Sequence, residues 1–68
     1  MTTLGEALPR EMARVTALIE LYAKLPSNAG AFAIFMMRKD LADATTALAV
    51  GDVATMARIY AELKEYKE

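Results

Sequence analysis

The sequence predicts an all-α protein, an antiparallel three-helix bundle in one domain, with helices at about residues 9–25, 29–50 and 53–66. Three observations predict this fold. Ala, Leu, Met, Glu, Lys and Arg dominate, and the alternating apolar pattern of strands is absent. Apolar residues recur at three- and four-residue intervals in three segments. The links between these segments are short, so successive helices should pack as antiparallel neighbours. A chain of 68 residues allows one domain.

The first helix is expected to occupy about Pro9–Leu25. Thr3 and Glu6 match the Ser/Thr-x-x-Glu capping box that opens helices, but Pro9 lacks a backbone donor and its ring crowds the preceding turn. Proline is favoured at the first helical position, which indicates a short turn followed by a helix from Pro9. The alternative is one helix that bends at Pro9. Pro26 ends the helix, because the residue before a proline is disfavoured in the α conformation.

The second helix should cover about residues 29–50 and the third about 53–66. Ser27 or Asn28 can cap the second helix. Gly51 can adopt the left-handed conformation that ends a helix, and Asp52 can cap the third helix immediately afterwards. The apolar spacing places the core stripe of the second helix at Ile34, Met37, Leu41, Ala44 and Leu48.

The composition excludes several classes of site. The chain has no Cys and no His, which excludes disulfides, thiolate and histidine metal sites, and His-dependent catalytic triads. Glu11, Asp40 and Asp43 are expected on solvated faces, since no spacing pairs two carboxylates for catalysis. We therefore expect no enzyme, no cofactor, no metal and no small-molecule substrate.

The N-terminal residues do not show the basic-then-apolar layout of a signal peptide. No apolar stretch approaches the roughly 20 residues that span a bilayer. We expect a cytoplasmic protein without membrane association.

The segment 31–37 is an apolar run with more apolar residues than one buried helix face can accommodate. At the helical repeat of 3.6 residues per turn, Phe32 and Met36 fall nearly opposite the expected core stripe, and Phe35 lies on its flank. Lys39 lies further along the same helix face, where the residues become polar. The run therefore carries a surplus of apolar surface that something must cover.

Three alternatives can cover this surplus. The chain can cover it internally, with Tyr22, Leu25 and Tyr66 closing over the phenylalanines. Another protein molecule can cover it, because exposed apolar patches mark contact sites and aromatic residues are common at the centre of interfaces. A small-molecule pocket is the third alternative. The contact residues of the second alternative are Phe32, Phe35, Met36 and Lys39, with Leu21 as an outlying contact.

We expect a small protein-interaction module whose partner is a second copy, giving a homodimer, or another protein. The alternative is a small DNA-associated regulatory protein. Nucleic-acid binding usually shows a clustered basic patch, whereas the net charge is −1 and acidic residues interleave with the basic ones. Nucleic acid is therefore not the expected partner. The regulator alternative would use Arg10, Arg14, Arg38 and Lys39.

The opening segment 1–15, together with Gly51-Asp52 and Ile59-Tyr60-x-x-Leu63, resembles a family of short uncharacterised bacterial α-helical proteins. The resemblance covers the whole chain and implies no activity, because none is established for that family. Separately, residues 47–60 are similar to the turn of a tetratricopeptide-type helical hairpin. One hairpin is not a repeat array, so this similarity implies helix-pair packing and an interaction role.

Overall fold

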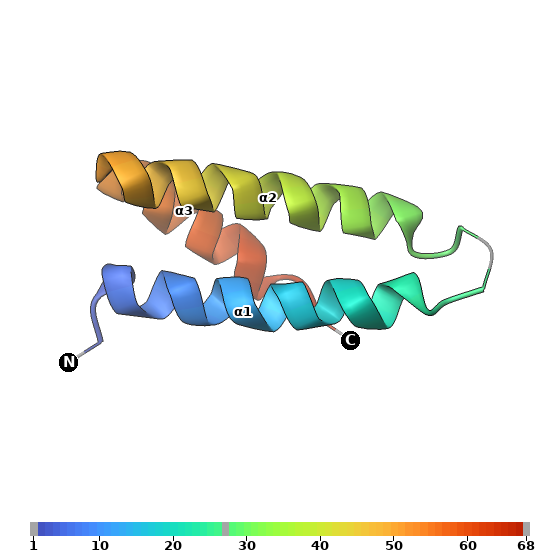
Figure 1. Cartoon of the computed structure of the whole chain (residues 1–68). Coiled ribbons are helices and arrows are strands. Elements are labelled where there is room, and N and C mark those ends of the chain that lie inside the picture. Colours follow the sequence, from blue (N-terminus) through green and yellow to red (C-terminus); the bar gives the residue numbers. More distant parts are fainter. Residues whose placement is uncertain (1, 27, 68) are drawn as a thin grey trace.

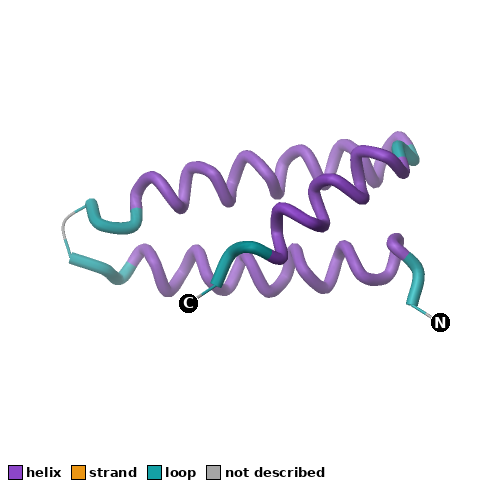
Figure 2. Tube along the Cα trace, turned by 180° about the vertical axis from the view of Figure 1, so that it is seen from behind, coloured by secondary structure: helices purple, strands orange, loops and turns teal. Residues whose placement is uncertain are grey.

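The computed structural model describes residues 2–26 and 28–67 and confirms an all-α three-helix bundle. The helices are α1 (Leu4–Ala23), α2 (Ala31–Val50) and α3 (Val53–Lys64), and each packs against the other two. Helices α1 and α2 run side by side in opposite directions (Figure 1). Helix α3 starts beside the end of α2 and lies obliquely across the pair (Figure 2).

Helix α1 begins earlier than the sequence predicts, because it runs through Pro9 from Leu4. The Thr3 side chain accepts a hydrogen bond from the backbone N–H of Glu6 at 3.2 Å, as the capping motif predicts. A proline inside a helix costs about 3 kcal/mol. Full burial of the Leu8 side chain stabilises the fold by a free energy of the same order, and Leu4 packs against the core as well. The expected start at Pro9 is therefore wrong, and the continuous helix is the alternative that the structure adopts.

The link between α1 and α2 depends on a close backbone approach at Gly30. The predicted cap at Ser27 lies outside the described residues. Asn28 does not cap α2, because the N-cap of this helix is Gly30, with no side-chain hydrogen bond. A Cβ atom at Gly30 would lie 2.8 Å from the Tyr22 carbonyl oxygen. Glycine is thus required for the backbones to meet, and α2 starts two residues later than predicted.

The turn between α2 and α3 follows the prediction. Gly51 has φ +72° and ends α2 in the left-handed conformation. The Asp52 side chain accepts hydrogen bonds from the Thr55 N–H at 3.2 Å and the Thr55 hydroxyl at 2.5 Å. These bonds lower the pKa of Asp52 below its usual value of 3.8, because they stabilise the carboxylate.

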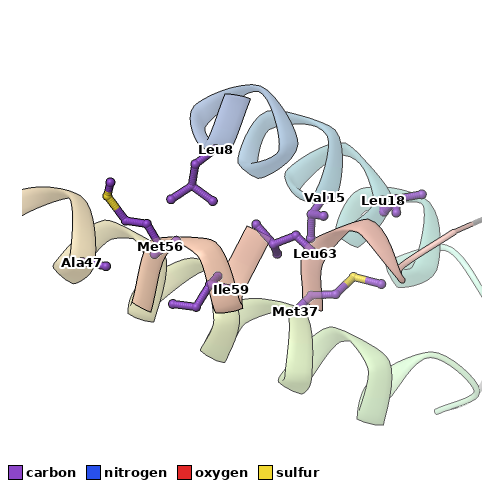
Figure 3. Packing of buried hydrophobic residues seen from close by; sticks show 9 residues of the cluster. Leu8, Val15, Leu18, Met37, Ala47, Met56, Ile59 and Leu63 are labelled. Carbon is purple, nitrogen blue, oxygen red and sulfur yellow. The ribbon is translucent and has the colours of Figure 1, made fainter. Parts of the chain in front are cut away.

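The core is a single cluster between the three helices (Figure 3). Its fully buried large side chains come from all three helices and are Leu8, Val15, Met37, Ile59 and Leu63. On α2 the buried face is centred on Ala33, Met37, Asp40, Ala44 and Ala47. This face is turned by about 60° from the predicted stripe at 3.6 residues per turn. Consequently Ile34 is only half-buried, and Asp40 occupies a core position.

Candidate interaction surface

The two phenylalanines at the start of α2 are uncovered in the single chain. Phe32 is 77% exposed and Phe35 is 64% exposed. The internal-cover alternative, in which Tyr22, Leu25 and Tyr66 close over them, is therefore wrong.

The length of α3 explains why the cover is missing. Helix α3 has 12 residues against 20 in α2, or roughly 18 Å against 30 Å at 1.5 Å per residue. It ends at Lys64, two residues before the predicted end, and Tyr66 reaches only as far as Asp40. Asp40 lies eight residues along α2 from Phe32, roughly 12 Å at that rise.

The other two predicted covering residues are directed elsewhere. The Tyr22 hydroxyl donates to the Lys67 carbonyl oxygen at 2.6 Å, and Leu25 is itself exposed. Leu21, the outlying contact in the prediction, is also exposed near the end of α1. The end of α1 therefore adds apolar surface of its own instead of covering α2.

The turned core face changes the roles of the predicted contact residues. Phe35, and not Phe32, lies most directly opposite the buried face, while Met36 is half-buried at its edge. Lys39 is exposed and forms an ion pair with Asp43, with 3.3 Å between Nζ and Oδ2. The structure therefore places all four predicted contact residues at the outer part of α2, with Met36 the least accessible.

Sequence reasoning missed two exposed apolar residues at the other end of α2. Val50 is 71% exposed and Val53 is 62% exposed, on either side of the Gly51-Asp52 turn. The sequence does indicate this exposure, because a valine that flanks a tight turn has few neighbours to cover it. Exposed apolar residues thus lie at both ends of α2.

Arg14 holds the C-terminal end of α3. Its guanidinium donates to the carbonyl oxygens of Leu63 and Tyr66, each at 2.8 Å, and pairs with Glu11 at 3.1 Å. A cation at a helix C-terminus satisfies the last carbonyls and complements the helix dipole. Arg14, which the regulator alternative assigned to DNA, therefore has a structural role within the chain, and Glu11 is only partly exposed.

Asp40 is not on a solvated face as predicted. It is 4% exposed and accepts a hydrogen bond from the Tyr66 hydroxyl, at 2.7 Å to Oδ2. Burial, this hydrogen bond, and the charges of Asp40 and Glu62 raise the pKa of Tyr66 above its usual value of 10.0. The tyrosine therefore stays protonated and fixes the segment after α3 against α2.

Two kinds of feature are absent from the residues that the structure describes. No three acidic side chains among them gather closely enough to hold a metal ion. None of the helices in residues 2–26 and 28–67 combines the length and the apolar content needed to cross a membrane.

Comparisons with known proteins supply no assignment. The chain matches no family model, and searches of curated proteins and of solved structures returned no match. The proposals below therefore rest on the residues and geometry of this chain.

Proposed function

We propose that this protein is a small protein-interaction module that forms a homodimer through the start of α2. The observation that carries the proposal is the exposure of Phe32 and Phe35, which lie three residues apart at the end of the bundle that α3 does not reach. Met36 and Lys39 border the phenylalanines on the same helix. Phenylalanine, like tyrosine and tryptophan, contributes strongly to the energetics of protein interfaces.

The exposed area supports an interface of modest size. A buried aromatic side chain covers about 150–250 Å², so the two side chains expose roughly 210–350 Å² per chain at the observed fractions of 77% and 64%. Stable interfaces bury about 800 Å² per partner. The phenylalanines can therefore form only part of a contact, and the remaining area must come from other parts of α2 or from α1.

The alternative of a DNA-associated regulator is not supported by a specific observation. Arg14 is engaged by the end of α3, and Lys39 is paired with Asp43. Arg10 and Arg38 are exposed on two different helices. Two of the four basic side chains would have to exchange partners within the chain for phosphate groups. The interaction module requires no such exchange.

Sedimentation equilibrium tests the proposal. The wild-type chain should shift from 7.4 kDa toward twice that mass as its concentration rises from about 1 µM to about 1 mM. Phe32→Glu should keep the chain monomeric, because it places a charge on an apolar part of the contact.

Two controls accompany this variant. Phe32→Glu should leave the helical circular dichroism unchanged, since an exposed side chain contributes little to folding. Ala13→Glu places the same charge on the outer face of α1 and should still dimerise. A wild-type chain that stays monomeric over the whole range would refute self-association.

A further inference from the structure

One row of residues on α2 joins the exposed apolar groups at its two ends. Its members follow one another at intervals of four, three, four, three and four residues, which places them on one helix face. Every member is exposed or half-buried. The α2 row, as we call it, consists of Phe32, Met36, Lys39, Asp43, Thr46 and Val50.

The charges in the α2 row are arranged so that the row complements itself. Lys39 and Asp43 lie on either side of the midpoint, and apolar residues lie at both ends. When two copies pair antiparallel about residue 41, each Lys39 faces the Asp43 of the other copy. The same register brings each Phe32 to the Val50 of the other copy, beside the exposed Val53.

Other arrangements lack this complementarity. A parallel pair would place Lys39 against Lys39 and Asp43 against Asp43, which is repulsive. The adjacent row on the outer side of α2, which contains Phe35, Arg38 and Ala42, has one basic residue and no acidic one. The α2 row is thus the face of this helix on which a second copy finds opposite charges.

We propose that two copies of the chain pair through antiparallel α2 rows, with reciprocal ion pairs between Lys39 and Asp43. This proposal rests on the self-association proposed above and adds its geometry. A two-fold axis makes the contact closed, so that it ends at a dimer. A helix of 20 residues offers a face roughly 30 Å long, which supplies the area that Phe32 alone does not. The existing Lys39–Asp43 ion pair within each chain becomes part of a cluster of four alternating charges.

Charge reversal tests the reciprocal pairs. Lys39→Glu alone or Asp43→Lys alone places two repulsive pairs in the homodimer, and each should weaken dimerisation about tenfold or more. A mixture of the two variants restores both attractive pairs in the heterodimer and should associate with nearly wild-type affinity.

The matched control is Arg38→Glu, which makes the same charge change one position away. Arg38 lies off the α2 row, and isolated surface charges contribute little to affinity. The dimerisation affinity of the Arg38→Glu variant should therefore remain within about threefold of wild type.

Cysteine cross-linking tests the orientation independently, because the wild-type chain has no cysteine. In the antiparallel register position 36 faces position 46 of the other copy. The double variant Met36→Cys/Thr46→Cys should therefore form a covalent dimer under mild oxidation. Each single variant should not, since its two cysteines would lie roughly 15 Å apart along the helix axis, beyond the reach of a disulfide.

The outcomes separate this geometry from self-association itself. Suppose that the wild-type chain dimerises and that Phe32→Glu abolishes the dimer, whereas Lys39→Glu and Arg38→Glu both leave it unchanged. This result would refute the antiparallel pairing of α2 rows but not self-association. Cross-linking by Met36→Cys alone would indicate a parallel pair and would also refute the proposal. A wild-type chain that never dimerises would refute both.

Discussion

The substitution Tyr66→Phe isolates a single hydrogen bond that fastens the end of the chain to α2. The Tyr66 hydroxyl donates to a carboxylate oxygen of Asp40 at 2.7 Å, and Asp40 is 4% exposed. Phenylalanine keeps the ring and its packing, so the variant removes only the donor. Hydrogen bonds to charged groups contribute about 1.5–3 kcal/mol, and a carboxylate this deeply buried cannot regain full hydration.

We expect Tyr66→Phe to lower the free energy of unfolding by about 2 kcal/mol. For a domain of this size this corresponds to a fall of about 10 °C in Tm. The loss is large against a total stability of roughly 3–10 kcal/mol for 68 residues. Urea denaturation followed by circular dichroism measures it, with the slope m unchanged if only stability is altered.

Two further variants sharpen this prediction. Tyr22→Phe removes a similar hydroxyl that donates to the exposed Lys67 carbonyl; water can replace that donor, so the loss should be about 0.5 kcal/mol. In an Asp40→Ala background, Tyr66→Phe should cost almost nothing, since its acceptor is already gone. A loss for Tyr66→Phe no larger than that for Tyr22→Phe would mean that the hydrogen bond to Asp40 does not stabilise the fold in this way.

The remaining predictions concern the two links and the end of α3. Gly30→Ala should destabilise the fold by about 2 kcal/mol in urea denaturation, because the new Cβ meets the Tyr22 carbonyl at 2.8 Å; a neutral effect would contradict the close approach. Arg14→Met should cost about 2 kcal/mol by releasing the carbonyl of Leu63 in α3 and that of Tyr66 just after it. The exposed Arg10→Met should stay within about 0.5 kcal/mol, and equal losses would count against the capping role. Because the pKa of Asp52 is lowered in the folded chain, its carboxylate stabilises the fold fully above pH 3.8. This stabilisation is lost as pH falls through the pKa that Asp52 has in the folded state. Thermal unfolding of Asp52→Asn should therefore depend less on pH below 4 than that of wild type, and identical profiles would contradict the assignment.

Local signals predicted much of the fold. The Thr3 cap and the Gly51-Asp52 turn appear in the structure as the sequence indicates, because each depends on residues within one helical turn of one another. Pro9 misled the prediction for an equally physical reason. The local cost of a proline in a helix was visible, but the compensating burial of Leu8 depends on the other two helices.

The contacts that position the candidate surface could not be predicted locally. Tyr66 lies 26 residues from Asp40 in the sequence, and Arg14 lies 49 and 52 residues from its two carbonyl partners. The sequence identified Phe32 and Phe35 as a surplus of apolar surface. Their exposure depends on where α3 ends relative to α2, which became clear only from the packed bundle.

In the proposed dimer, a second copy of the chain covers the start of α2. Sedimentation equilibrium of wild type beside Phe32→Glu, at matched concentrations, measures this association. We expect a reversible dimer for wild type and a single 7.4 kDa species for the variant, with equal helical content. A wild-type mass of 7.4 kDa at the highest concentration, or a dimer that Phe32→Glu does not weaken, would contradict it.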